Sequence, residues 1–380
     1  MLPYGKQTIE QDDIDAVVDV LKSDFLTTGP KVAEFEAALC QVTGASEAVV
    51  VGNGTHALHL ACMAAGLGEG DFAIVPTLTF LATANAVRYC GADVIFCDVD
   101  ADTGLIDLAA LQALLEQHAD KSIKAILPVH LAGQIVDLTA IKNLLNGREI
   151  KIIADACHAI GGHKGNYSVG SSTLEDMSCF SFHPVKTICM GEGGAITLND
   201  ADLANKMRTW RSHAMVKTPD IGAWAYEMSD LGYNYRATDF QCALGISQLQ
   251  KLARFAQKRQ QLVSLYNELF ADLAPFVLPS KQLEGQEPAW HLFAARFDFD
   301  AISKTRDQVM KALFDQGIGT QVHYIPVHAQ PYYTNLYGEQ SMLGAETYYH
   351  QTLSLPLYPL MDEADVRSVV AAIKAVCVNK

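Results

Sequence analysis

The sequence predicts an α/β fold built around a largely parallel sheet that helices cover on both faces. Short apolar runs rich in β-branched residues alternate with helical segments. Strands that are apolar along their whole length are typical of a sheet buried on both faces, and their alternation with helices is typical of parallel pairing. The seven runs lie at residues 48–51, 72–76, 93–97, 125–129, 151–155, 178–182 and 195–199. We therefore expect a seven-stranded, mostly parallel sheet.

The remaining elements are predicted from helical periodicity and from chain breakers. Apolar residues at helical spacing in "IDAVVDVL" (14–21) predict a first helix, and a second begins near Lys31, after "SDFLTTGP" breaks the pattern. A long helical stretch covers residues 241–273. Beyond it we expect a strand, a helix, a strand and a final helix, at residues 290–300, 303–317, 318–326 and 363–376.

The length of the chain predicts two domains. A chain of 380 residues exceeds one ordinary domain, so a large domain with a smaller companion is expected. The alternation of strands and helices stops at the long helical stretch. We therefore expect residues 1–250 to hold the N-terminal segment and the large domain, and residues 251–380 to form a small α+β domain.

Composition and charge exclude several classes of partner. A formal net charge of −15 argues against nucleic acid and against anionic membranes, because both require clustered Lys and Arg. The nine cysteines are dispersed and form no Cys-x-x-Cys pair, which is typical of reduced thiols in a cytoplasmic protein and predicts no metal site. The N-terminus lacks the features of a signal peptide, and no apolar run approaches the ~20 residues that span a bilayer. We expect a cytoplasmic protein.

The turn after the first predicted strand is rich in small residues. In "AVVVGNGTHALHLA" a strand runs into Gly52, Asn53, Gly54 and Thr55, and a helix follows. Such a turn lets backbone N–H groups and a helix N-terminus approach a phosphate. The spacing also satisfies a loose dinucleotide fingerprint, which would indicate a nicotinamide oxidoreductase, although the acidic residue expected about 20 positions later is missing. A tight turn without a ligand is the third interpretation.

Two further motifs place reactive side chains at the ends of predicted strands. In "KIIADACHA", Asp155 ends an apolar strand and His158 follows three residues later; the alternative is an Asp that caps the next helix. In "SFHPVKTICMGEGGA", Ser181 and His183 lie near a strand end and Lys186 precedes a glycine cluster. A lysine beside an apolar strand end can lose its proton and attack a carbonyl, whereas an exposed lysine stays charged.

Phosphate turn, carboxylate and lysine together are what pyridoxal 5'-phosphate (PLP) requires. The lysine forms a Schiff base with the cofactor, the carboxylate keeps the pyridine nitrogen protonated, and the turn holds the phosphate. Phe80, in "TLTFLATANAV", lies in a loop from which it can stack on the ring, although a Phe after a strand usually belongs to the core. His183 receives no role from these arguments.

Ordered motifs along nearly the whole chain resemble one family. They are "YGKQTIEQDDIDAVVDVLKSDFLTTGP", "GTHALHLA", "TFLATANAV", "DVDADTGLID", "PVHLAGQ", "DACHAIGG", "SFHPVKTICMGEGGA", "LGYNYRATDFQCALG", "VHYIPVHAQPYY" and "LSLPLYP". The chain is similar to the DegT-type sugar-nucleotide aminotransferases, and most similar to the branch that serves pseudaminic acid biosynthesis. The resemblance implies the PLP-dependent transferase fold of the aspartate aminotransferase type, fold type I.

The resemblance also implies roles for individual residues. Lys186 matches the Schiff-base lysine, and Asp155 matches the partner of the pyridine nitrogen. The other positions that match cofactor contacts are Gly54, Thr55, Phe80, His158, Ser181 and Asn234. Asn234 matches a residue that reaches the phosphate in the neighbouring subunit, which implies a homodimer with shared active sites. Positions that match contacts to the sugar nucleotide are Tyr4, Asp24, Phe25, Leu26, Thr27, Asn53, Tyr324 and His328.

The implied reaction is a transamination with L-glutamate as amino donor. The implied acceptor is a nucleotide-linked 4-keto-6-deoxy sugar, UDP-2-acetamido-2,6-dideoxy-β-L-arabino-hex-4-ulose, in the biosynthesis of pseudaminic acid or another surface polysaccharide. A 4-keto-pentose or a GDP-linked hexose is the alternative acceptor. A dehydratase is disfavoured because members of that branch replace the lysine, and a catalytically silent PLP-fold regulator would lose Lys186 or Asp155. Departures from the family at Asn53 and His56 leave the sugar open; Ala154 and Ala214 are two others.

Overall fold

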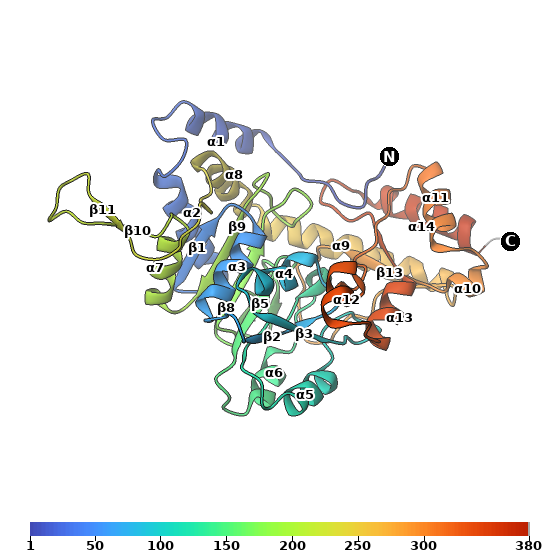
Figure 1. The fold of residues 1–380 in the computed structure, drawn as a ribbon. Coiled ribbons are helices and arrows are strands. Elements are labelled where there is room, and N and C mark those ends of the chain that lie inside the picture. The colour runs from blue at the N-terminus through green and yellow to red at the C-terminus, as the bar shows by residue number, and fades with distance from the viewer. Residues whose placement is uncertain (379–380) are drawn as a thin grey trace.

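A computed structural model describes residues 1–378, and its centre is the expected α/β sheet (Figure 1). The sheet has seven strands in the order β1-β9-β8-β5-β4-β2-β3. The strands are β1 (Glu47–Val51), β2 (Phe72–Pro76), β3 (Asp93–Cys97), β4 (Ile123–Ile126), β5 (Lys151–Asp155), β8 (Met177–Ser181) and β9 (Gly194–Leu198). All neighbours pair in parallel except β9, which is antiparallel to both β1 and β8. The predicted seven-stranded, mostly parallel sheet is confirmed.

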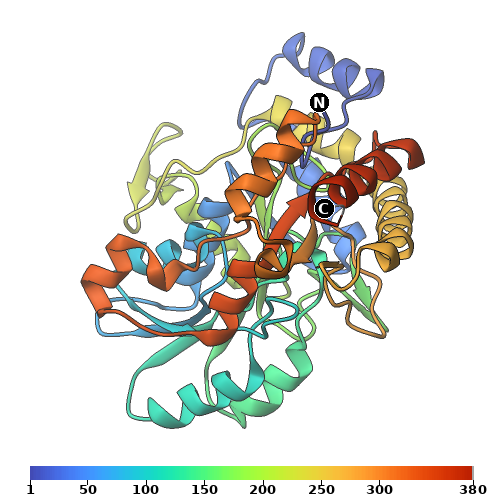
Figure 2. The same ribbon diagram turned by 90° about the vertical axis from the view of Figure 1, so that its right-hand side faces the viewer.

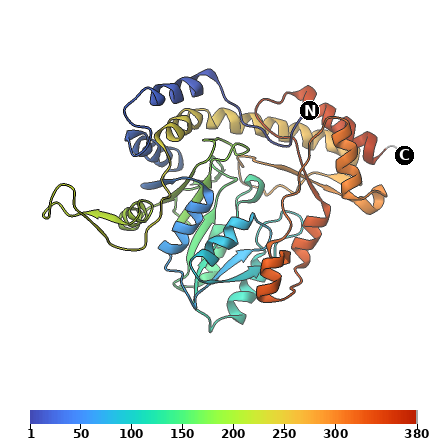
Figure 3. The same cartoon turned by 45° about the horizontal axis from the view of Figure 1, so that its top comes forward.

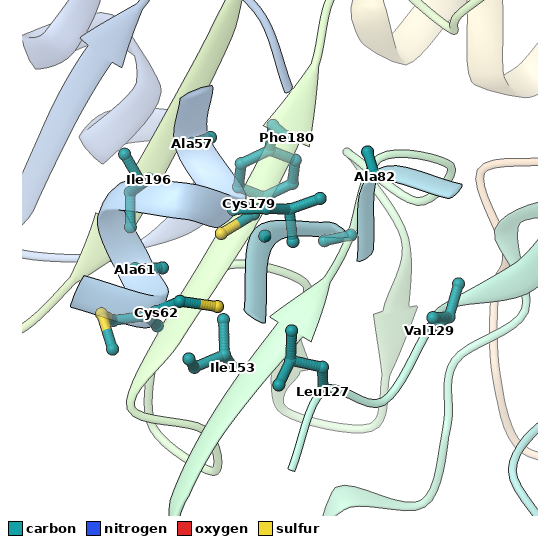
Figure 4. Packing of buried hydrophobic residues seen from close by; sticks show 14 of the residues in the cluster. Ala57, Ala61, Cys62, Ala82, Leu127, Val129, Ile153, Cys179, Phe180 and Ile196 are labelled. Atoms are coloured by element: carbon teal, nitrogen blue, oxygen red, sulfur yellow. The ribbon is translucent and has the colours of Figure 1, made fainter. Parts of the chain in front are cut away.

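Helices from the first two thirds of the chain lie around this sheet, except the first of them, which packs on the last one instead (Figure 2). They are α1 (Gln11–Leu21), α2 (Pro30–Thr43), α3 (Gly54–Ala64), α4 (Leu81–Tyr89), α5 (Leu108–Gln117), α6 (Leu138–Leu145), α7 (Ala201–Trp210) and α8 (Asp239–Leu249). Helix α3 packs on β8 and β9 with small side chains, so its backbone lies close to the sheet. Figure 4 shows Ala57 and Ala61 of α3 beside Cys179, Phe180 and Ile196. This packing fixes the N-terminus of α3 next to the end of β8.

The C-terminal third builds a smaller unit around its own sheet. Its strands are β12 (Val277–Leu278), β13 (Phe293–Phe297) and β14 (Thr352–Leu355), and its helices are α9 (Leu252–Phe270), α10 (Phe299–Ile302), α11 (Arg306–Asp315), α12 (Pro331–Tyr337), α13 (Leu343–Gln351) and α14 (Glu363–Cys377). Helix α9 runs along one side of the molecule in Figure 3.

Two apolar cores correspond to these two units. The smaller core begins with Leu262 and contains a stacked pair, Tyr266 and Phe293, with ring centroids 4.5 Å apart. Tyr333 of α12 and Tyr348 of α13 pack instead into the larger core, although they belong to the last part of the chain. The domain boundary near residue 250 stays a prediction.

Two elements differ from the sequence predictions. The helical stretch expected over residues 241–273 is two helices, because the chain turns at Gln250 and Lys251 and directs Lys251 into a buried ion pair. The strand expected over residues 318–326 does not form. This segment makes only isolated bridges, from Ile318 to Leu2 and from Gln321 to Ser354, since its polar side chains follow the wall of a cavity.

Small elements complete the fold. They are β6 (His163–Lys164), β7 (Tyr167–Ser168), β10 (Met215–Lys217), β11 (Tyr226–Met228), η1 (Leu131–Gly133), η2 (Ala271–Leu273) and η3 (Val327–Ala329). The β10–β11 hairpin projects from the body (Figure 1), and the sequence analysis did not predict it. Within residues 1–378, no helix combines the length and the apolar character that crossing a bilayer requires.

A buried carboxylate attaches α1 to the rest of the molecule. Asp13 is fully buried and accepts hydrogen bonds from Lys251 Nζ at 2.6 Å, Ser247 Oγ at 2.6 Å and Gln248 Nε2 at 2.8 Å. Burial by itself raises the pKa of Asp13, but the bonds from Lys251, Ser247 and Gln248 outweigh it and hold the pKa below its usual value. These bonds therefore anchor α1 to the end of α8 and to Lys251, the residue that precedes α9.

Replacement of Asp13 by Ala should lower the free energy of unfolding by about 3 kcal/mol or more, because a buried ion pair loses one partner. Denaturant unfolding measures this difference. Since the pKa is lowered in the folded state, the stabilisation is present above the ordinary pKa of Asp and is lost as the pH falls through the folded value. The control is Asp315→Ala, which breaks the exposed Lys311–Asp315 pair and should cost at most about 0.5 kcal/mol. Equal effects of the two variants would contradict the assigned role of Asp13.

Candidate active site

A cavity of about 560 Å³ opens where the carboxyl ends of the central strands meet the C-terminal unit. This is the edge at which open α/β sheets place their ligands. The predicted residues that line the cavity are Tyr4, Asn53, Gly54, Thr55, Phe80, Asp155, His158, Ser181, Lys186 and Tyr324. The structure therefore brings together side chains from six separate stretches of the chain. Ten of the sixteen predicted site residues share this one cavity.

Asp155 lies at the end of β5 with only 5% of its surface exposed. Its Oδ2 accepts a hydrogen bond from Thr83 Oγ1 at 2.7 Å, and its Oδ1 accepts one from the Cys157 backbone N–H at 3.2 Å. A buried carboxylate needs such donors, and it favours a cation or a protonated ring in front of it. The alternative that Asp155 caps a helix is not supported, since its oxygens bond Thr83 and Cys157 instead.

Lys186 lies in the turn after β8, half-buried on the floor of the same cavity. Its backbone N–H donates to the His183 carbonyl at 2.9 Å. Burial lowers the pKa of the Lys186 amine, and the nearby carboxylate of Asp155 opposes that shift only in part. A lowered pKa raises the fraction of free amine at neutral pH, which a nucleophilic lysine needs.

The turn between β1 and α3 has the shape that a phosphate group requires. A Cβ added to Gly54 would lie 2.9 Å from Ser181 Cβ, so only glycine allows this close approach between the turn and the end of β8. Asn53 Oδ1 accepts a hydrogen bond from the His56 N–H at 2.9 Å and caps α3. The N-terminus of α3, Thr55 and Ser181 thus face one space, and such helix ends favour anions.

His158 and Tyr324 form the opposite wall. His158 Nδ1 accepts a hydrogen bond from the Ala132 backbone N–H at 3.2 Å, and its Nε2 lies 3.3 Å from the Tyr324 hydroxyl. Burial, then the charge of Lys186, lowers the pKa of His158 well below its usual value, so the ring is uncharged. The Phe80 ring, 56% exposed, stands at the cavity mouth with its centroid 5.9 Å from that of Tyr324.

The other predicted site residues do not line this cavity within one chain. Residues 24–27 are exposed, with Thr27 bridging to Thr238, and Asn234 is also exposed. His328 is buried outside the cavity, with its Nδ1 2.5 Å from Thr77 Oγ1. Their roles in binding stay predictions.

Several residues that line the cavity or support its lining are not predicted from the sequence. Thr83, which bonds Asp155 from behind the lining, lies three residues after Phe80, and His323, which lines the cavity, precedes Tyr324. Both fall within motifs quoted in the sequence analysis. His323 Nδ1 lies 2.7 Å from Ser354 Oγ, and burial followed by the charge of Lys186 lowers its pKa to about 3. Cys157 and His291 also line the cavity. His183 had been noticed without a role, and it lies at the cavity rim.

A family model matches residues 7–374, almost the whole chain, and it describes the DegT/DnrJ/EryC1/StrS aminotransferase family. The chain belongs to this family. The UDP-4-amino-4,6-dideoxy-N-acetyl-beta-L-altrosamine transaminase of Campylobacter jejuni is 39% identical over 97% of this chain and 96% of its own length. The spore coat polysaccharide biosynthesis protein SpsC of Bacillus subtilis is 37% identical over 98% and 96%.

Solved structures of family members share the fold. Helicobacter pylori PseC, an aminotransferase involved in the biosynthesis of pseudoaminic acid, superposes with a TM-score of 0.91 at 29% identity over 99% of both chains. The PLP form of the putative sugar aminotransferase Spr1654 of Streptococcus pneumoniae has a TM-score of 0.89 at 26% identity, covering 99% of this chain and 98% of its own. A PMP form of that protein is also known.

These comparisons confirm the predicted family, the PLP-enzyme fold and the aminotransferase class. The PLP dependence predicted for the family agrees with its solved PLP and PMP forms. The cavity fits this cofactor on its own geometry. The turn at the N-terminus of α3, where Gly54 allows close approach to Ser181, can accommodate a phosphate group. The buried carboxylate of Asp155 can accept a hydrogen bond from a protonated ring nitrogen.

Replacement of Thr83 by Val should weaken PLP binding about tenfold, because a hydrogen bond to a charged group contributes about 1.5–3 kcal/mol and Asp155 Oδ2 would lose its donor. Absorbance titration of the unloaded protein with PLP measures the affinity. The matched control is Thr209→Val on α7, whose hydroxyl bonds only the Asn205 carbonyl. Unchanged PLP affinity in Thr83→Val would rule out its role in holding Asp155.

Proposed function

We propose that this aminotransferase transfers an amino group from L-glutamate to a nucleotide-linked 4-keto-6-deoxy sugar, UDP-2-acetamido-2,6-dideoxy-β-L-arabino-hex-4-ulose. The observation that carries the proposal is the cavity that holds Lys186, Asp155 and the α3 turn together. The choice of acceptor is supported by the Campylobacter jejuni relative, whose name specifies a UDP-linked 4-amino-4,6-dideoxy sugar. Such a product would serve pseudaminic acid or another surface polysaccharide.

The residues of the cavity have separate tasks in this proposal. When bound, PLP supplies an aldehyde that condenses with amines and a ring that accepts electrons. Gly54, Thr55 and Ser181 would hold its phosphate. Asp155, whose oxygens accept hydrogen bonds from Thr83 and Cys157, would keep the ring nitrogen protonated. The Lys186 amine acts as nucleophile and then carries a proton from the donor carbon, which its lowered pKa favours.

The alternative acceptor for the same reaction is another 4-keto sugar nucleotide, either a 4-keto-pentose or a GDP-linked hexose. A relative supports the pentose: the UDP-4-amino-4-deoxy-L-arabinose–oxoglutarate aminotransferase of Shewanella sediminis is 35% identical over 100% of this chain. A nicotinamide oxidoreductase has less support, because its one argument was the turn after β1, which here faces Lys186 and Asp155.

We also propose a homodimer whose active sites are shared between two copies of the chain. The β10–β11 hairpin carries apolar side chains that one chain leaves in solvent, since Trp224 is 80% exposed and Met228 69%. Contiguous exposed apolar surface is typical of protein interfaces. Asn234 follows this hairpin and is exposed, so a second copy is needed to bring it to a cofactor phosphate. A cytoplasmic location stays a prediction.

A panel of 4-keto sugar nucleotides tests the acceptor. With glutamate, the UDP-linked 4-keto-6-deoxy-N-acetyl sugar should be aminated fastest, at least about tenfold ahead of the pentose and the GDP-linked hexose, which corresponds to about 1.4 kcal/mol of discrimination. Product mass and NMR configuration identify the amine.

The control for this panel is Lys186→Ala, which should show no turnover and no visible PLP band that borohydride removes. An active Lys186→Ala protein would contradict the role of the lysine. A faster reaction with the pentose or the GDP-linked sugar would leave the aminotransferase assignment intact and replace the acceptor.

The combined substitution Trp224→Glu and Met228→Glu should convert the dimer to monomer, because burying two carboxylates in an apolar interface is costly. Light scattering after gel filtration measures the mass, and PLP titration should show weaker binding in the monomer. Leu343→Glu on α13, at a comparably exposed leucine distant from the hairpin, is the control. A monomeric wild-type protein at micromolar concentration would refute the proposed dimer.

A further inference from the structure

The backbone of Ala132 connects His158 of the cavity to the entrance of the C-terminal unit. The Ala132 N–H donates to His158 Nδ1 at 3.2 Å, and the Ala132 carbonyl accepts from the backbone N–H groups of His291 at 2.9 Å and Leu292 at 3.3 Å. One residue therefore bonds a cavity histidine through its N–H group and residues that precede β13 through its carbonyl group.

The conformation that allows this double contact is unfavourable by itself. Ala132 has φ +60°, in the left-handed region, which costs roughly 1–2 kcal/mol for a residue with a Cβ. The next residue, Gly133, approaches the opposite segment so closely that an added Cβ would lie 2.7 Å from the Ala289 carbonyl oxygen. Left-handed non-glycine residues persist where the surrounding contacts determine them, and they cluster at functional sites.

The bond from Ala132 determines which nitrogen of His158 carries the proton. An acceptor Nδ1 has a free lone pair, so the proton of the uncharged ring is on Nε2. Nε2 is the nitrogen near the Tyr324 hydroxyl, at 3.3 Å. The backbone thus selects the tautomer that presents an N–H donor toward Tyr324.

The ring of His291 limits the movement of the His158 ring. The two ring centroids are 4.4 Å apart with planes inclined by 49°, and His291 is 3% exposed. Its Nδ1 is buried and has no hydrogen-bond partner among the described residues, which is uncommon for a buried polar atom and needs an explanation. Burial lowers the pKa of His291 well below its usual value, so two uncharged rings lie side by side.

The position of His291 is in turn fixed from α9. Arg259 is buried, and its Nη1 donates to the carbonyl oxygens of His291 at 3.2 Å and Leu357 at 2.7 Å. The arginine therefore joins the segment before β13 to the segment after β14. Displacement of either segment would withdraw His291 from the His158 ring and the two N–H donors from the Ala132 carbonyl.

We propose that His291 and the Ala132 backbone are positioning groups for His158, which presents its Nε2–H to the cavity only while the segment 289–292 is seated against residues 131–133. His291 acts by packing on the ring, and Ala132 acts by fixing the tautomer. A hydrogen bond from His158 to bound PLP would rest on the proposed function. The tautomer of His158 and its dependence on His291 do not rest on that function.

The test is the ¹⁵N NMR spectrum of histidine-labelled protein, with and without PLP, in which the two ring nitrogens of an uncharged histidine differ according to which one carries the proton. Comparison with His158→Gln assigns the His158 signals. The wild-type protein should show only the Nε2–H form of His158. In His291→Ala the signals should broaden or become a mixture of both forms, and in His291→Phe, which keeps an aromatic ring in place, the Nε2–H form should return.

Steady-state kinetics of the PLP-loaded protein give the second readout. His291→Ala should lower kcat by about tenfold or more with little change in KM, because misplacement of a catalytic group affects the reacting state. His291→Phe should recover most of this loss. His163→Ala, at an exposed histidine of β6, is the control and should match the wild type in both readouts.

Several results would overturn the proposal. They are a wild-type His158 in the Nδ1–H form, an unchanged His158 spectrum in His291→Ala, and equal kcat losses in His291→Ala and His291→Phe. If His291→Ala does not fold, Gly133→Ala is the second variant, because its added Cβ would push the segment 289–292 away from residues 131–133. The His158 signals should broaden in Gly133→Ala as well. A wild-type His158 spectrum in Gly133→Ala would also refute the proposal. A protein that fails to bind PLP while His158 keeps the Nε2–H form would refute the proposed function alone.

Discussion

The buried carboxylate of Asp155 is the constraint on which the site depends. A charge with 5% exposure at the end of a strand is costly unless donors surround it, and the chain supplies them locally. The start of α4 supplies the Thr83 hydroxyl, and the turn after β5 supplies the Cys157 N–H. The backbone of Asp155 bonds Pro128 and His130, which prolongs the sheet contact beyond β4. The carboxylate is therefore held by α4 and by the turn after β5, and the segment after β4 fixes the backbone that carries it.

Few of the side chains that line the cavity carry a charge. Among the described lining residues, the charged side chains are Asp155, Lys186 and Glu192. The buried histidines 158, 291 and 323 contribute no charge, because burial lowers the pKa of each. The Lys186 amine thus titrates under opposing influences: burial lowers its pKa, and Asp155 raises it. A nearby cationic histidine would further disfavour the charged lysine, while an uncharged one can donate or accept hydrogen bonds.

The sequence predicted the seven strands because buried parallel strands are apolar along their length. It predicted Asp155 because this residue ends such a strand, and Lys186 because it lies in the short segment between another strand and a glycine cluster. The family resemblance placed the remaining contacts. The features that could not be predicted depend on contacts between segments that lie far apart in the sequence. Thr83 looks like any helix residue until its hydroxyl is seen on Asp155. The segment 318–326 has the alternation of a strand, yet its partners are single residues, Leu2 and Ser354. Asn234 and residues 24–27 are exposed and do not line this cavity, so one chain does not reveal their role.

Segments from both ends of the chain line the cavity, so the contacts that hold these segments in place also determine the shape of the site. The Gly319 N–H bonds the Leu2 carbonyl, and the Leu357 N–H bonds the Tyr4 carbonyl, so the start of the N-terminal segment is held against the C-terminal unit. Its far end is held by the Asp13–Lys251 pair at the start of α9. The same helix carries Arg259, which fixes the His291 segment. Helix α9 therefore determines the position of Tyr4 at one wall and of His291 at another. A shift of this helix would change both walls together, whereas Asp155 is held at the end of β5 in the sheet.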